Sequence, residues 1–193
     1  MKLKMNLVAL ALGSLAAGAA FAQAGTVQRD VNQQQRIEQG LQSGSLSTGE
    51  AARLEREQSR VDRDQARALR DGNLSPAEKA RLQREQNRAS RDINRLENNA
   101  QKGNPNSASS RRMQADVQRD VNQQRRIEQG VKSGSLTNRE AAKLEAGQAR
   151  DSRLQARAGA NGNVSAKEQA RLQKSENRQS RRIHKEKHDP QTK

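Results

Sequence analysis

The chain repeats itself at a fixed offset, and this repetition limits the possible folds more than any other feature of the sequence. The octapeptide Val27–Gln34 recurs unchanged as Val117–Gln124, an offset of 90 residues. More than half of the positions from 31 to 99 match their partners at the same offset. Two copies of one module therefore account for nearly the whole chain.

The remaining segments divide the chain around the two modules. Residues 103–110 are rich in Gly, Pro, Asn and Ser, which predicts a flexible linker. The predicted organisation is a signal peptide over 1–22, a first module over 23–102, the linker over 103–110, a second module over 111–189 and a disordered tail over 190–193.

A short phrase, Gly-x-Leu/Val-Ser/Thr-x-x-Glu, occurs twice in each module. Its glycine can adopt the left-handed conformation that ends a helix, and Ser or Thr three residues before Glu forms a capping box that starts the next helix. The phrase is therefore predicted to be a tight turn between two helices. Its Gly, Ser/Thr and Glu positions are Gly44, Ser47, Glu50, Gly72, Ser75, Glu78, Gly134, Thr137, Glu140, Gly162, Ser165 and Glu168.

The segments between these turns are rich in Ala, Arg, Gln, Glu and Leu, which favour helices, and contain no alternating β-branched run. The sequence predicts an all-α fold with three antiparallel helices per module, arranged either as hairpins or as loose three-helix bundles. Leu54, Val61 and Ala68 form one narrow apolar stripe, and Leu82, Ala89 and Leu96 form another, with a marginal core expected because large apolar residues are scarce. The predicted helices are 27–42, 48–70, 75–100, 114–132, 137–158 and 165–188.

The first 22 residues have the pattern of a secretory signal. Lys2 and Lys4 precede an apolar stretch over 7–20, and Ala20–Ala22 is an A-x-A cleavage site. We expect export by a Gram-negative bacterium to the periplasm or the medium, with cleavage near Ala22. No membrane-spanning segment is expected after cleavage, because the apolar stretch is short and diluted with Gly, Ala and Ser.

The composition excludes several kinds of site. The chain has no Cys, Trp or Tyr, and its only Phe, Phe21, lies in the predicted signal. Disulfides, thiolate metal sites and aromatic platforms for stacking bases or sugars are therefore excluded from the mature part. The net charge of +15 for the whole chain falls to +13 once Lys2 and Lys4 are removed, and this favours anionic partners.

Arginines recur every three or four residues on the second and third predicted helices of the first module. This spacing places them on one helix face, and guanidinium groups in a row suit phosphates of nucleic acid, lipopolysaccharide or another polyanion. The alternative is a solvated face with ion pairs to Glu55, Glu57, Asp62 and Asp64. The candidate polyanion-binding residues are Arg53, Arg56, Arg60, Arg63, Arg67, Arg70, Arg81, Arg84, Arg88, Arg91 and Arg95.

The only histidines, His184 and His188, have the i, i+4 spacing of a two-His metal pair, and the alternative is a basic C-terminal end. No nucleophile with a base, no phosphate-binding loop and no paired carboxylates in an apolar pocket can be identified, and we expect too little core to shield such a site. An enzyme is not expected, nor is a cofactor. The predicted function is a structural or interaction protein that binds envelope phosphates or nucleic acid without sequence preference.

Several phrases, among them Arg36–Gly40, Glu50–Leu54 and Asn177–Ile183, resemble a group of small exported proteobacterial proteins of unknown function. This resemblance implies export and helical repeats. A looser similarity exists to the Spy/CpxP-type periplasmic chaperones, whose helices start with L-T-x-x-Q motifs, whereas Leu136–Glu140 ends in Glu. It implies, as an alternative, a holdase that covers unfolded client proteins. The sequence predicts no oligomeric state.

Overall fold

The protein is built from six α-helices. The computed structural model describes residues 14–189, with side chains from residue 23, and it contains no strand in this range. This confirms the predicted all-α class. The helices are α1 (Ser14–Ser43), α2 (Thr48–Ala68), α3 (Pro76–Glu97), α4 (Ala108–Ser133), α5 (Asn138–Ala158) and α6 (Ala166–Lys187).

Both ends of the chain carry predictions that the structure does not test. Residues 1–13 of the predicted signal peptide and residues 190–193 of the predicted tail lie outside the described residues. Among the helices of the described range, none is long and apolar enough to cross a membrane.

The four repeated turns share one local structure. Their glycines, Gly44, Gly72, Gly134 and Gly162, all have a positive φ, from 69° to 92°. In each turn the Ser or Thr side chain accepts a hydrogen bond from the backbone N–H of the Glu three residues on, and that carboxylate accepts one from the backbone N–H of the Ser or Thr. The capping residues are Ser47, Ser75, Thr137 and Ser165. Each turn reverses the chain, so consecutive helices within a module are antiparallel.

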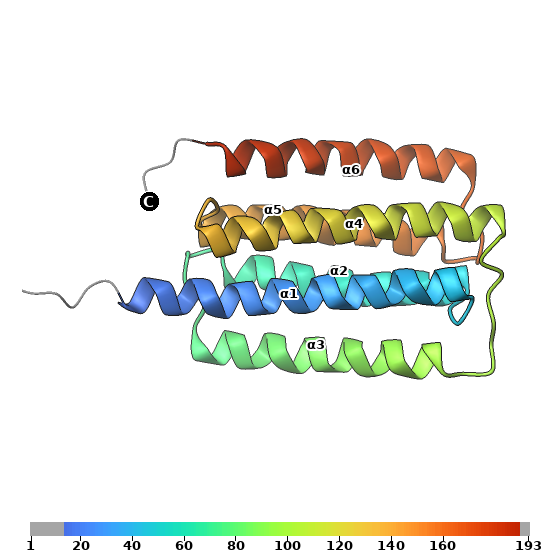
Figure 1. Ribbon diagram of the computed structural model, residues 1–193, viewed down its shortest axis with the longest axis horizontal. Coiled ribbons are helices and arrows are strands. Elements are labelled where there is room, and N and C mark those ends of the chain that lie inside the picture. Colours follow the sequence, from blue (N-terminus) through green and yellow to red (C-terminus); the bar gives the residue numbers. More distant parts are fainter. Residues whose placement is uncertain (1–13, 190–193) are drawn as a thin grey trace, which may run out of the picture.

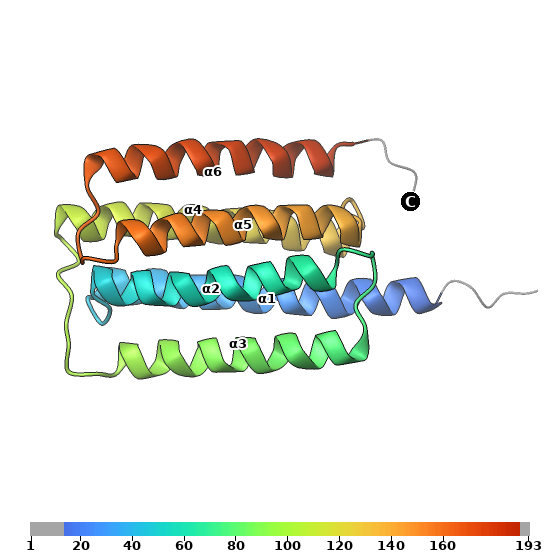
Figure 2. The ribbon, with the colours of Figure 1, turned by 180° about the vertical axis from the view of Figure 1, so that it is seen from behind.

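The helices form a four-helix centre with one helix added at each edge. In Figure 1, α1 and α4 lie side by side in the front layer, and in Figure 2, α2 and α5 do so in the opposite layer. Helix α3 packs against α1 and α2, and α6 packs against α4 and α5, at opposite edges. The most extensive packing, α2 with α5 and α1 with α4, joins helices of different modules. Each module contains the three antiparallel helices that the sequence predicted, and the packing of the modules on each other, which the sequence left open, is now evident.

Residues 90 positions apart meet between α2 and α5. Ser59 Oγ donates to the backbone oxygen of Ala149 at 2.8 Å, and Ser152 Oγ donates to Asp62 Oδ2 at 3.4 Å. Helices α5 and α6 also begin and end 90 residues after α2 and α3. Contacts between equivalent residues are characteristic of a two-fold axis. The two modules are thus arranged about an approximate two-fold axis that passes between α2 and α5.

Two apolar clusters hold the molecule together, and each draws on both modules. One includes Ile37, Leu41 and Leu54 of the first module with Met113 and Leu172 of the second. The other joins residues such as Ala24 and Val27 to Ile127, Leu144 and Ile183. The predicted stripe residues Leu54, Val61, Ala68, Leu82, Ala89 and Leu96 are all buried.

The segment predicted as a flexible linker is attached to the first module. The backbone N–H of Gly103 donates to the oxygen of Gly44 at 2.8 Å. A side chain at Gly103 would lie 2.4 Å from the backbone oxygen of Leu46, so only glycine fits there. Ser107 caps α4, and residues 108–110 form its first turn. Short polar residues suit both linkers and helix caps, which explains why the sequence pattern suggested a longer linker.

Candidate functional site

A basic groove runs between α2 and α5, on the face shown in Figure 2. It consists of two depressions of about 400 and 410 Å³ that share Arg63. The other lining residues are Ser59, Ala66, Ala142, Ala146 and Ala156, so no carboxylate lines it. We call this feature the arginine groove, and its cationic residues are Arg56, Arg60, Arg63 and Arg67 of α2, Arg70 in the turn after α2, and Arg139, Lys143, Arg153 and Arg157 of α5.

Small residues allow the two helices of the groove to approach closely. Ala52, Ser59 and Ala66 recur every seven residues in α2, and Ala142, Ala149 and Ala156 recur in the same way in α5. A spacing of seven keeps them on one helix face. The 2.8 Å hydrogen bond from Ser59 to the backbone of Ala149 shows how near the backbones lie. This seam aligns an arginine row of each module along the same groove.

Most cations of the groove have no acidic partner. Within the described part of the chain, Arg56, Arg60, Arg63, Arg153 and Arg157 are exposed and form no ion pair. At the periphery of the groove, Arg67 lies 3.4 Å from Asp64 and Lys143 lies 3.7 Å from Glu186. The centre of the groove therefore concentrates positive charge that no ion pair of the described residues offsets.

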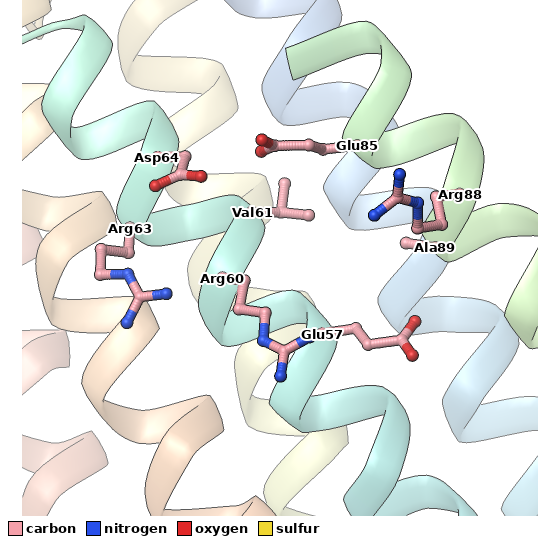
Figure 3. A pocket seen from close by; sticks show the side chains of 8 residues that line it. All are labelled: Glu57, Arg60, Val61, Arg63, Asp64, Glu85, Arg88 and Ala89. Atoms are coloured by element: carbon pink, nitrogen blue, oxygen red, sulfur yellow. The ribbon is translucent and has the colours of Figure 1, made fainter. Parts of the chain in front are cut away.

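The arginine row of α3 has a different setting. Figure 3 shows the depression between α2 and α3, where Glu57, Asp64 and Glu85 lie among Arg60, Arg63 and Arg88. Arg81 contacts Asp64 and Glu85, both at 3.1 Å, and Arg95 lies 2.9 Å from Asp92. Arg84 and Arg91 are exposed without lining a described depression. The α3 side of this depression fits the alternative interpretation of the sequence, a helix face with ion pairs, whereas Arg60 and Arg63 border both this depression and the arginine groove.

The structure thus brings together only part of the predicted set. Arg53 is exposed on α2 but does not line the groove. Arg139, Lys143, Arg153 and Arg157 of the second module were missed. Their counterparts in the first module, 90 positions earlier, are Gly49, Arg53, Arg63 and Arg67, in the same order. Extending the arginine pattern into the second module was the available signal, but the contact between α2 and α5 was not evident from sequence.

Two of the acids predicted as surface partners of the arginines are instead buried. Glu55 is 0% exposed and Asp62 is 2% exposed. They lie on the side of α2 that faces the second module, which the helical periodicity alone did not distinguish from a solvated face. The interpretation of Glu55 and Asp62 as ion-pair partners on a solvated helix face is therefore wrong.

Asp30 of α1, Asp62 of α2 and Glu145 of α5 form a cluster of buried carboxylates. Their carboxylate oxygens lie within 4.8 Å of one another, and all three residues are buried. Oxygen ligands of this kind are those that hard cations such as Ca²⁺ and Mg²⁺ take. The amide groups of Gln65 and Gln86 donate to Asp30 at 2.5 and 2.7 Å.

Burial changes the acidity of these groups. Desolvation raises the pKa of Asp30 to about 7, against hydrogen bonds from Gln65 and Gln86 that lower it. Desolvation, together with the charge of Asp30, raises the pKa of Glu145 to about 8. The pKa of Asp62 is raised well above its usual value by burial, and then by Glu145, Asp30 and Glu55. Carboxyl groups with such pKa values are partly protonated at neutral pH.

The two histidines lie on the exposed end of the molecule. Their rings stack with centroids 4.2 Å apart, and His188 Nδ1 lies 2.7 Å from the backbone oxygen of His184. His188 follows the last residue of α6. Metal binding by this pair stays a prediction.

No family model, curated protein or solved structure matches this chain.

Proposed function

We propose that the protein is an exported, non-enzymatic protein that binds polyanions without sequence preference through the arginine groove. The observation that carries the proposal is the lining of the groove, which combines cationic side chains of both modules with small residues and no carboxylate. Export to the periplasm or the medium rests on the signal pattern of residues 1–22.

The shape and chemistry of the groove favour an extended ligand. The lining residues of the groove on α5 run from Arg139 to Arg157, so the groove follows a length of about 27 Å. Guanidinium groups donate pairs of hydrogen bonds to phosphate or carboxylate oxygens, and releasing counterions from a linear polyanion contributes most of the binding free energy. Because the chain has no Trp or Tyr, the arginine groove has no aromatic side chain on which bases could stack.

The decisive experiment compares two variants of equal net charge. One carries Arg60→Gln, Arg63→Gln and Arg153→Gln in the groove, and the control carries Arg84→Gln, Arg91→Gln and Arg181→Gln on exposed outer faces. Affinity for inorganic polyphosphate is measured over a range of salt concentrations. We expect the wild-type affinity to fall steeply with salt. The slope of log K against log salt should decrease by about 0.7 for each groove arginine removed.

The control separates the groove from overall charge. It should retain most of the wild-type affinity and slope, while circular dichroism shows that both variants keep their helices. Equal losses in the two variants would show that only net charge matters, and the arginine groove would then not be the binding site.

The chaperone alternative requires apolar surface that is open to clients. Leu54, Val61 and Leu82 are at most 3% exposed, so client binding through these stripes would require the helices to separate. The exposed groove therefore supports polyanion binding better than it supports holdase activity.

A further inference from the structure

Buried acids lie between the two modules, and the arginine groove does not use them. The first cluster is Asp30, Asp62 and Glu145, which come from α1, α2 and α5 and have exposures of 1%, 2% and 0%. Their oxygens lie within 4.8 Å of one another although Asp30 and Asp62 belong to one module and Glu145 to the other. The cluster therefore lies across the interface between the modules.

A second set occupies the equivalent place on the other side of the two-fold axis. Glu55 and Asp120 correspond to Glu145 and Asp30 at the offset of 90, and both are buried. Asp62 corresponds to Ser152, which donates to Asp62 at 3.4 Å. Further acids surround this second set, namely Asp116 of α4, Asp151 of α5 and Glu176 of α6.

The groups that face these acids from the packed helices are mostly neutral amides. The donors are Gln65 and Gln86 to Asp30, Gln124 to Glu145, Gln34 to Glu55 and Gln155 to Asp120. Helix α3 contributes only the neutral Gln86. Cations approach only some of these acids: Arg29 acts on Asp30, Arg119 contacts Glu176 at 3.1 Å and acts on Asp116, and Arg150, Arg178 and Arg182 act on Asp151.

Within the described residues, no ion pair reaches Asp30, Asp62 or Glu145. Carboxylates this close together in a buried site cannot all be ionised, because each negative charge raises the cost of the next. Loss of their protons therefore places repulsion directly between α1 and α2 on one side and α5 on the other. The closed interface requires that some of these groups stay protonated.

We propose that these buried acids form a proton-controlled latch between the modules, which is shut when they are protonated and which loosens the contact of α2 with α5 when they ionise. Protonated carboxyl groups can donate hydrogen bonds within the clusters, whereas ionised ones can only accept. The latch is independent of the arginine groove as a binding site, although both lie along the same pair of helices.

The pH range follows from the acidity of the groups. Burial raises the pKa of Asp30 and Glu55 to about 7 and those of Glu145 and Glu176 to about 8, whereas the unfolded values lie near 4. Stability is complete below pH of about 4, where both states are protonated. It is lost as pH rises to about 8, because only the folded state retains these protons. In this window each such group raises the unfolding constant by about tenfold per pH unit.

The test uses the full chain and two readouts. Urea unfolding is measured from pH 4 to 9 for the wild type and for Asp62→Asn with Glu145→Gln, which keeps the side-chain shapes and removes two of the three titrating groups of the first cluster. Asp71→Asn, at an exposed acid, is the control. Because the chain has no cysteine, spin labels at Arg84→Cys and Lys174→Cys report the distance between α3 and α6, at opposite edges of the molecule.

We expect the wild type and the Asp71→Asn control to lose stability as pH rises, and their α3 to α6 distance to lengthen or broaden above pH of about 7. Both changes should be smaller in the double variant, in which Asp30 and the second set still titrate. A distance that stays constant from pH 5 to 9 would overturn the latch, as would equal pH dependence in the double variant and the wild type. If the double variant does not fold, the wild-type distance still decides between these outcomes.

Discussion

At the scale of single residues, Ser152 is where the two modules differ with most effect. It lies next to the two-fold axis, opposite its own counterpart Asp62, to which it donates a hydrogen bond. It also lowers the pKa of Glu55 by hydrogen bonding. If the second module were an unchanged repeat of the first, position 152 would hold another acid. The neutral Ser152 hydroxyl group is there instead, and it contacts acids of both buried clusters, Asp62 and Glu55.

Replacing Ser152 by Asp should therefore destabilise the fold in a pH-dependent manner. An unpaired buried charge costs about 3–5 kcal/mol, and we expect a loss of this order at pH 8. The loss should be smaller at pH 5, where the added group can bind a proton. Ser152→Ala removes hydrogen bonds only and should cost about 1–2 kcal/mol at both values.

Urea unfolding of the two variants at pH 5 and pH 8 gives the comparison. A loss for Ser152→Asp that is the same at both pH values would show that the site is more open to water than its burial suggests.

The sequence indicated the polar character of this site only in part. Gln58 and Gln65 interrupt the apolar stripe of α2, and both are buried, as their position in the stripe implies. The burial of Glu55 and Asp62 was not foreseen, because the spacing of residues shows which share a helix face but not which faces a second module covers. That information depends on the pairing of α2 with α5.

At the scale of helices, the ends were better predicted than the pairings. The predicted range 48–70 compares with Thr48–Ala68, and 137–158 with Asn138–Ala158, because a cap and a glycine mark these ends locally. The range 114–132 missed the first six residues of α4, which Ser107 caps. The contact of α2 with α5 depends on small residues every seven positions, a weaker signal than a stripe of leucines.

A larger side chain in this seam should separate the two helices. We expect Ala149→Leu to destabilise the fold by about 1–3 kcal/mol, because the backbone of Ala149 is contacted directly by Ser59. Ala146→Leu is a matched control on the same helix at an exposed position of the groove wall, and it should be nearly neutral.

Thermal unfolding measures both variants. Equal melting temperatures would contradict the close packing of α2 on α5.

At the scale of the whole molecule, the two modules share their apolar clusters. Neither cluster is complete within one module, since each combines residues from both sides of the connection at 98–107. The duplication predicted two modules of helices, but it did not predict their joint core, because a repeat is equally compatible with two independent domains.

Separate modules should therefore be poorly folded. We expect peptides of residues 23–102 and 103–189 to show much less helix by circular dichroism than the intact chain, because isolation exposes Ile37 and Leu54 or Ile127 and Leu144. Mixing the two peptides in equal amounts should restore helix. Full helicity of either peptide alone at micromolar concentration would show that it supplies a core of its own or pairs with a second copy of itself.

The contacts between residues 90 positions apart also bear on how chains associate during folding. The surface that each module presents to the other is nearly the same on both, so the first module of one chain can pack on the second module of another without new contacts. What favours closure within one chain is the short connection between α3 and α4, which keeps the local concentration of the partner module high. Dimers in which two chains exchange modules are therefore the misassembled form that we expect of this fold. Refolding at high protein concentration should increase their amount.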